Sequence, residues 1–396
     1  MTPPHLLLRR LAVAGGSLLA AGTVAAQVSA PLAEPPIEKH HWFPEQFYDA
    51  EDGQFDMSRW LIEKKGFLPV PIIITEPAVG FGGGLAPMFF SESMASAAMK
   101  SKDSGHVVPP DIYAAGAFGT ENGTWGAFGG GMVNFMDDRY RWRGGLGRMN
   151  VNLDFYGPGG KVGPLGYNLD GWASVQHGMV RLGDSNAWFV AKWNYFDLKN
   201  TFDLPGESAQ FADPSRHNTS SGLGVALEYD SRDNIFTPNK GWTGAVDLTF
   251  YDPDIGSDTR FQSYRAHVFS YWKVSPVLVL GLRADGRAAE GDVPFYMLPF
   301  VDLRGVPAMR LQDTRTAVLE TELRWNLDHR WALVGFLGGG KAWGTREDFS
   351  DGASTVSKGA GFRYLIASKL GIYMGMDMAW STQDKAWYIQ VGNAWR

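Results

Sequence analysis

Two short motifs in this sequence have residue types and spacing that could do chemistry. Residues 335–341, GFLGGGK, have the spacing of a phosphate-binding loop. Position 342 is alanine, so the hydroxyl that would contact magnesium is missing. Residues 183–185, Gly-Asp-Ser, resemble the nucleophile block of one lipase class, but these residue types are also the usual residues of a tight turn. We interpret the first motif as a glycine-rich strand and the second as a hairpin turn.

The histidines are the other candidates for chemistry. His177, His217 and His267 could each act as the general base of a surface enzyme. His40 and His41 are adjacent, and neighbouring residues on an extended segment rarely converge on one metal ion. For His177, His217 and His267 we favour a position that lines the lumen or lies in a loop. We therefore predict no catalytic residue, no metal site and no cofactor, and we classify the chain as a non-enzyme.

The composition limits the class of protein. The chain of 396 residues has 49 Gly, 24 Phe, 15 Trp and no Cys, and its formal net charge is -6. An absence of thiols fits an oxidising compartment such as the periplasm or the cell surface. No run of basic residues stands out, so nucleic acid is not an expected partner.

The N-terminus has the pattern of a secretory signal. Arg9 and Arg10 precede an apolar stretch over residues 11–23, and Val24-Ala25-Ala26 provides small residues for cleavage. The apolar stretch is shorter than the ~20 residues that span a bilayer, although a retained anchor is the alternative. We predict a signal peptide over residues 1–26 and a periplasmic segment over residues 27–68, with a short helix within residues 56–65.

From residue 69 the chain consists of segments in which apolar and polar residues alternate. Over residues 277–288 one face is leucine-rich and the other carries Arg283, Asp285 and Arg287. Residues 315–327 repeat this arrangement, with Glu320 and Glu322 on the polar face. The segments often exceed ten residues, whereas strands of soluble proteins cluster near ~5–6. Tryptophans recur at segment ends, as in the aromatic girdles of membrane barrels. A soluble sandwich would also alternate, but it does not accommodate so many long strands.

The pattern predicts an all-β fold, a transmembrane antiparallel β-barrel over residues 69–396. We place fifteen strands, and because bacterial barrels have even numbers we expect sixteen. The missing strand is residues 69–75, or residues 139–155 contain a β-bulge at Arg148, where the apolar parity switches. We expect the loops at residues 91–110, 199–219 and 290–314 to be extracellular and the turn at residues 273–276 to be periplasmic.

Three patches of the sequence resemble the BamA/TamA-type outer-membrane assembly superfamily, also called bacterial surface antigens, and they follow one another along the chain in the order found in that family. Residues 303–306, Leu-Arg-Gly-Val, look like its Arg-Gly signature in the sixth extracellular loop, and residues 317–327 look like the strand that follows. A patch that looks like the family's periplasmic turn between two mid-barrel strands precedes them. Its matching residues are Asp230, Arg232, Asp233, Pro238 and Gly241.

The resemblance implies that the loop folds into the barrel lumen and that Arg304, next to Gly305, pairs there with inward-facing acids. Glu322 is the best candidate partner and Glu320 the second. The sequence also departs from the family. Val306 replaces an aromatic, and a further family acid would fall near Gly338. Residues 27–68 are too few for a POTRA domain, so the resemblance is to a barrel-only member.

These observations favour a multi-pass protein of the bacterial outer membrane with a role in membrane biogenesis or in lipid or protein handling. A solute-permeable pore is the main alternative because the inner face is charged, and a surface enzyme is a third. The expected partners are outer-membrane lipids including lipopolysaccharide and the barrel-assembly machinery that inserts the chain, with further copies of the chain in a homo-oligomer as another candidate.

Overall fold

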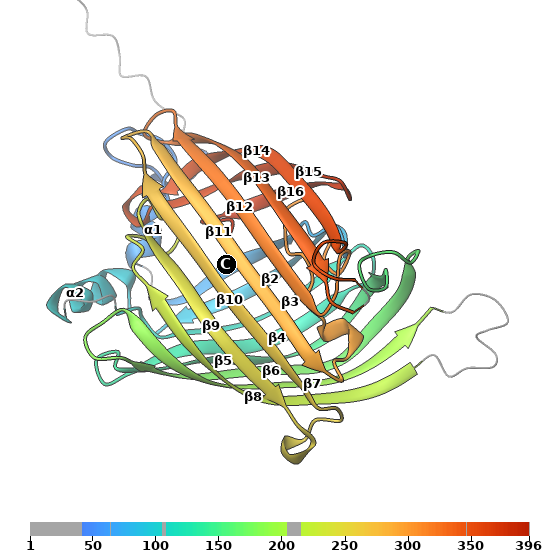
Figure 1. Ribbon diagram of the computed structural model, residues 1–396. Helices are drawn as coiled ribbons and strands as arrows, with labels where there is room; N and C mark the ends of the chain where they lie inside the picture. Colours follow the sequence, from blue (N-terminus) through green and yellow to red (C-terminus); the bar gives the residue numbers. More distant parts are fainter. Residues whose placement is uncertain (1–41, 64, 105–107, 204–214, 346, 396) are drawn as a thin grey trace, which may run out of the picture. The chain divides into compact units, whose positions relative to one another are not determined.

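The computed structural model describes residues 42–63, 65–104, 108–203, 215–345 and 347–395. Within residues 44–395, sixteen strands form one sheet in which each strand pairs with the next in sequence, and every pair is antiparallel (Figure 1). The predicted all-β barrel of sixteen strands is therefore confirmed. The strands are β1 (Gly66–Ile74), β2 (Gly82–Phe90), β3 (Ile112–Thr120), β4 (Trp125–Phe135), β5 (Tyr140–Phe155), β6 (Leu165–Arg181), β7 (Ala187–Phe202), β8 (Ser215–Asp230), β9 (Gly241–Tyr251), β10 (Phe261–Lys273), β11 (Leu278–Gly291), β12 (Arg315–Asn326), β13 (Trp331–Trp343), β14 (Ala353–Ala367), β15 (Ile372–Ser381) and β16 (Lys385–Val391).

The helices are short and lie outside the strands. They are η1 (Glu45–Phe47), α1 (Ser58–Glu63), α2 (Met94–Ser104), η2 (Pro253–Ile255), η3 (Phe295–Met297) and η4 (Ser368–Leu370). The helix expected within residues 56–65 is α1, and the Asp56 carboxylate accepts a hydrogen bond from the Ser58 amide at 2.6 Å. Among the described residues, none of the helices has the length and apolarity needed to cross a bilayer. The predicted signal peptide, His40 and His41 lie outside the described residues.

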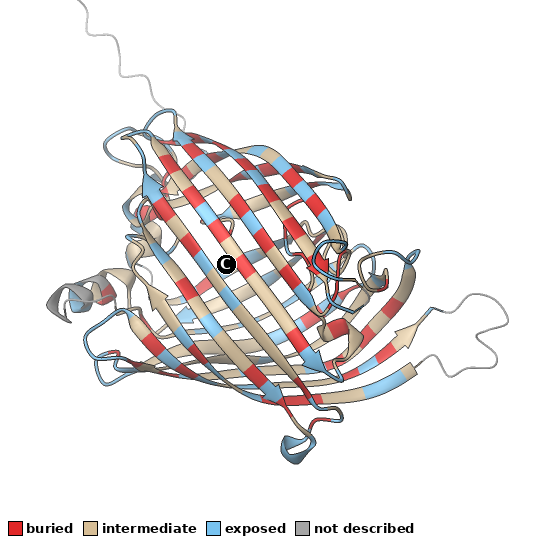
Figure 2. Cartoon of the chain, viewed as in Figure 1, coloured by how far each residue is buried: buried red, intermediate tan, exposed pale blue. Residues whose placement is uncertain are grey.

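The two faces of the barrel wall have opposite polarity. Successive side chains of a strand point to opposite faces of the sheet, and Figure 2 shows the resulting alternation of buried and exposed residues along the strands. On β12, Leu319 is 67% exposed on the outer face, whereas Glu320 is 3% exposed on the inner face. An apolar outside and a charged inside reverse the order found in soluble sandwiches. This arrangement is what a wall surrounded by lipid requires.

The strand missing from the sequence prediction is β1, so the choice of residues 69–75 was correct to within a few positions. β2 ends and β3 begins at the end of the barrel where the chain enters β1, which we call the entry end. The turn at residues 274–277 is at the same end, whereas β7 ends and β8 begins at the far end, where residues 292–314 also connect β11 to β12. The prediction that all three loops are extracellular is therefore wrong, because the five strands β3–β7 separate the first loop from the second, and an odd number of antiparallel strands puts the two at opposite ends of the barrel.

The predicted β-bulge at Arg148 is also wrong. β5 pairs with β4 and with β6 in uninterrupted register. The apolar residues change face because the environment changes along the strand. Up to Leu146 the outer face is apolar, and beyond it the outer face carries Arg148, paired with Asp170 at 2.8 Å. On this upper part it is the inner face that packs against apolar side chains of the loop between β11 and β12.

The sheet has two unpaired edges. Within the described residues no backbone ladder joins β1 to β16, and we call this junction the seam. β16 has seven residues and β1 has nine, whereas β5–β8 have 16 or 17 each. Seven residues are fewer than the ~9–11 that a tilted strand needs to cross the hydrocarbon. Pro69 and Pro71 remove two amide donors from β1, as is usual for edge strands. The seam is the weakest part of the wall.

The polarity of the outer wall leads to a prediction. Leu319→Arg places a cation against the middle of the lipid layer, and it should lower the free energy of unfolding by about 2–4 kcal/mol. Asp154→Arg lies on the outer face of the polar extension of β5 and should change it little. Urea unfolding in liposomes, followed by tryptophan fluorescence, measures both. Equal effects of the two substitutions would contradict a lipid boundary near Leu146.

Candidate functional site

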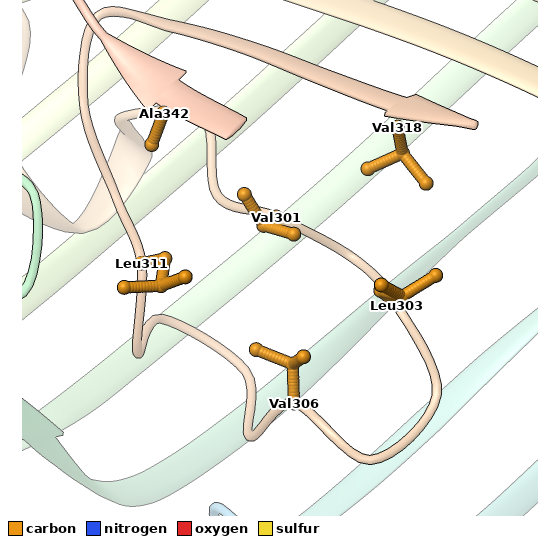
Figure 3. Close-up of a cluster of buried hydrophobic side chains, with 6 residues drawn as sticks. All are labelled: Val301, Leu303, Val306, Leu311, Val318 and Ala342. Carbon is orange, nitrogen blue, oxygen red and sulfur yellow. The ribbon is translucent and has the colours of Figure 1, made fainter. Parts of the chain in front are cut away.

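The loop between β11 and β12, residues 292–314, folds into the barrel interior. Four of its apolar side chains are buried against inward-facing side chains of β12 and β13 (Figure 3). The cluster comprises Val301, Leu303, Val306, Leu311, Val318 and Ala342. The glycines of β13 make room for it, because a Cβ at Gly338 would lie 2.7 Å from Leu303. We call residues 292–314 the plug loop.

Arg304 places a positive charge at the tip of the plug loop, among three carboxylates of the wall. Its Nε donates a hydrogen bond to Glu320 at 2.7 Å, and its Nη1 donates one to Asp377 at 2.9 Å. The same Nη1 lies 2.8 Å from Glu322. The guanidinium also stacks on Phe336, 3.6 Å from the ring centroid. Arg304 is 8% exposed, so these partners replace its hydration.

The structure therefore brings Arg304, Glu320 and Glu322 together, but in a different order from the one expected. Glu320 is the hydrogen-bonded partner, and Glu322 contributes charge at short range. Asp377 on β15 was missed by the sequence analysis. It also binds Arg363 on β14 at 2.5 Å, which holds the carboxylate toward the lumen. The position where a further acid was expected, Gly338, is the one that accommodates Leu303.

Gly305 positions the plug loop through its backbone. Its φ of +82° is unfavourable for residues with a side chain, and a Cβ here would lie 3.1 Å from Ala379. The Gly305 amide donates to the Tyr388 hydroxyl at 2.8 Å, and its carbonyl accepts from the Ser381 hydroxyl at 2.6 Å. The Ser357 hydroxyl donates to the Arg304 carbonyl. The plug loop is thus fixed to β14, β15 and β16.

The segment that follows β16 also enters the lumen. Trp395 is 3% exposed, and its indole donates to Glu320 at 2.8 Å. Its ring lies against Phe269 and Tyr271 on β10, across the lumen from β16. Glu320 therefore joins two segments that enter from opposite ends of the barrel, the plug loop through Arg304 and this final segment through Trp395. Nothing in the sequence pattern indicated this contact.

The turn motif between β8 and β9 is a compact, hydrogen-bonded turn at the entry end. Arg232 pairs with Asp230 at 2.6 Å, and the Asp233 carboxylate accepts from the backbone amides of residues 239 and 240. Gly241 has a φ of +95°, and Pro238 is fully buried. Asn234 donates to the carbonyl of Leu370 in the turn between β14 and β15 at 2.8 Å, so the motif reaches across the lumen mouth.

The short motifs and the histidines that could have belonged to an enzyme lie in strands and turns of the barrel wall. Residues 335–341 lie within β13, and residues 183–185 lie in the turn between β6 and β7. His177 and His267 are on different strands of the inner wall, and His217 binds Asp197 at 2.5 Å on the outer face. In the part of the chain that the structure describes, no three His, Asp or Glu side chains are grouped as metal ligands would be.

The segment before β1 docks on the turns at the entry end. Arg330, in the turn between β12 and β13, is 1% exposed and is bound by Asp49, Asp52 and Asp56. The Met57 amide donates to the carbonyl of residue 366 on β14 at 2.6 Å. We call residues 45–63 the strap.

Docking of the strap lowers the pKa of two of its carboxyl groups. The hydrogen bond from Arg330 lowers the pKa of Asp52. Burial acts to raise the pKa of Asp56, but hydrogen bonds from Ser58, Ser368 and Arg330 outweigh it, and the pKa lies well below its usual value. Both carboxylates are therefore more stable in the docked strap than in a free one.

Solved structures with the same fold were found, although no protein-family model and no curated protein matches the chain. One is BamA from Haemophilus ducreyi lacking POTRA domains 1–3, with 11% identity, a TM-score of 0.59, and coverage of 83% of this chain and 70% of that one. Two others are CdiB from Acinetobacter baumannii and from Escherichia coli, with 10% and 9% identity and TM-scores of 0.54 and 0.57. These matches cover 83% and 82% of this chain but only 60% and 62% of each CdiB. The fold is that of a BamA-type barrel.

Arg304 provides a first test of the site. Arg304→Ala leaves three carboxylates together without their shared cation, and it should cost about 3–5 kcal/mol of stability. Freed from the wall, the plug loop should also admit ions. Thermal unfolding and single-channel conductance in planar bilayers measure the two effects. Arg315→Ala, which removes an exposed pair with Glu290, is the matched control and should change neither. Wild-type conductance and stability in Arg304→Ala would refute the proposed role of this cluster.

The strap should resist acid. A carboxyl whose pKa is depressed by folding contributes stability above its unfolded pKa of about 3.9 and loses it only as the pH falls through the folded value. The strap should therefore stay docked at pH 4 and detach only in stronger acid. A fluorophore on Arg59→Cys reports docking during titration. In Asp52→Asn/Asp56→Asn this pH dependence should disappear. Detachment of the wild-type strap between pH 4 and 5 would contradict the depressed pKa values.

Proposed function

We propose that this chain is an integral protein of the bacterial outer membrane that acts in membrane biogenesis or in lipid or protein handling, with the seam as its working surface. The observation that carries the proposal is that the edge strands β1 and β16 are not joined by a backbone ladder in the part of the chain that the structure describes. Hydrocarbon offers no partner for free amide and carbonyl groups, and each unsatisfied group costs several kcal/mol. The seam therefore has to be covered by another polar backbone or by lipid headgroups. This need defines the class of substrate as a membrane-embedded strand or a lipid.

The plugged lumen supports this proposal. The plug loop and Trp395 fill the part of the interior next to β10–β15, so the wall there offers no continuous passage. The BamA and CdiB barrels that share the fold are consistent with an outer-membrane location. Lipopolysaccharide and phospholipids would contact the outer face, and the barrel-assembly machinery would insert the chain.

A solute pore is the second candidate function, and one observation favours it. Val175 on the inner face of β6 is 41% exposed, so the lumen beside it is not filled by the described residues. Charged pairs surround this region, including Lys192 with Asp247 at 3.0 Å. A steady conductance of the wild-type barrel in planar bilayers would favour the pore, and brief or absent openings would favour the seam.

Locking the seam tests the proposal directly. Phe81 and Trp387 stack across its far end, with ring centroids 5.8 Å apart. The chain has no native cysteine, so Phe81→Cys/Trp387→Cys can be joined by a short, reducible bifunctional thiol reagent. In a deletion strain, the locked protein should fail to restore outer-membrane protein levels and lipid asymmetry, and reduction should restore both.

The matched control is Gly335→Cys/Ala360→Cys, which joins two outward positions on strands that are already paired. It should support growth and membrane integrity whether joined or reduced. If the locked seam restores the membrane as well as the control does, the seam is not the working surface.

A further inference from the structure

We propose that the strap is a latch that holds the entry end of the seam closed, with Arg330 as its anchor. The inference rests on the proposed function in one respect, that the seam is the working site. It goes beyond that function by identifying the element of this chain that regulates the seam. Three observations support it. The strap is docked on the β16 side of the seam, it is connected to β1 on the other side, and no backbone ladder joins β1 to β16 among the described residues.

On the β16 side, the strap is fixed to the turn between β12 and β13, to the end of β14 and to the turn between β14 and β15. Arg330 uses Nε, Nη1 and Nη2 to bind the three strap carboxylates, so each nitrogen of the guanidinium donates to a carboxylate. The Tyr364 hydroxyl donates to the carbonyl of Phe55 at 2.9 Å. The Lys369 amide donates to the Ser58 hydroxyl at 3.0 Å. These contacts specify one docked position of the strap rather than a general electrostatic attraction.

On the other side, the strap is connected to β1 and contacts the segment between β2 and β3. α1 lies against α2 (Figure 1), and it also contacts η4. Only residues 64 and 65 separate the end of α1 from Gly66, the first residue of β1. Because a residue spans at most ~3.6 Å, the start of β1 stays within about 11 Å of the end of α1. Docking of the strap beside η4 therefore keeps the entry end of β1 near the β14–β15 turn.

The seam makes this restraint important. A barrel with a continuous ladder would hold β1 through its backbone hydrogen bonds, and a strap would add little. Here β1 and β16 have no such ladder, so their separation depends on contacts at the two ends. Phe81 with Trp387 acts at the far end, and the strap acts at the entry end. Release of the strap should let the entry end of the seam widen.

Spin-label distance measurements in nanodiscs test the latch without any assay of biological function. Labels at Phe67→Cys and Val391→Cys lie on the outer face at the entry ends of β1 and β16, and they report the width of the seam. Labels at Arg59→Cys and Lys369→Cys report docking of the strap. Labels at Leu333→Cys and Phe362→Cys, a registered pair on β13 and β14, are the internal control.

In Arg330→Ala the docking pair should separate, and the Phe67–Val391 distribution should shift by several ångströms and broaden. The control pair should stay unchanged. Arg260→Ala, which breaks an exposed pair with Asp252 at the far end, should move none of the three. A strap that undocks while the seam keeps its width would overturn the proposal. A strap that stays docked without Arg330 would overturn it too, because the anchor would lie elsewhere.

These measurements also separate the latch from the proposed function. If the seam widens in Arg330→Ala but the cross-linked seam still restores the deletion strain, the latch stands and the working surface is wrong. If the cross-linked seam fails in the strain while Arg330→Ala leaves the seam width unchanged, the working surface stands and the latch is wrong.

Discussion

The contact between Arg304 and the carboxylates of Glu320 and Asp377 is the interaction on which the rest of the interior depends. A buried guanidinium and buried carboxylates are tolerated only together, since removing either side leaves uncompensated charge. The elements that bear these groups must therefore meet, although they are far apart in sequence. Their meeting draws the plug loop into the lumen and turns β15 so that Asp377 faces inward. The glycines of β13, the hydroxyls that bind Gly305 and the indole of Trp395 all fit around this one cluster.

The barrel itself could be predicted because its main determinant is local. An apolar outer face and a charged inner face give a period of two that is visible within each segment, as in β11 and β12. The same rule produced the error at Arg148. It assumes one environment along a whole strand, and β5 passes from an apolar surrounding into a polar one beyond Leu146. The position where the apolar residues switch to the other face of the strand therefore shows where β5 leaves its apolar surroundings. It does not indicate an irregular backbone.

The candidate site could be predicted only where a motif marked it. Arg304, Glu320 and Glu322 lie within one stretch of sequence that resembles a known loop and strand. Asp377 has no such mark, because its role depends on the closure of the sheet, which brings β15 opposite the plug loop. Trp395 was missed for a related reason. The strand ends at Val391, Gly392 turns the chain with a φ of +76°, and the direction after that turn is set by contacts with β10 and β12.

The plug loop and the strap together explain how a sheet with two free edges keeps its form. The plug loop holds the β16 edge, because Gly305 binds Tyr388 on β16 and Ser381 at the end of β15. It also reaches the β1 edge, since the Ala308 amide donates to Glu76, just after β1, at 2.9 Å. At the entry end the strap, which is continuous with β1, is held by Arg330 and by the turn between β14 and β15. Side-chain contacts at both ends thus substitute for a backbone ladder, and side-chain contacts can be exchanged without unfolding a strand. Because none of the fifteen strand pairings crosses the seam, the opening that we propose would leave them all intact.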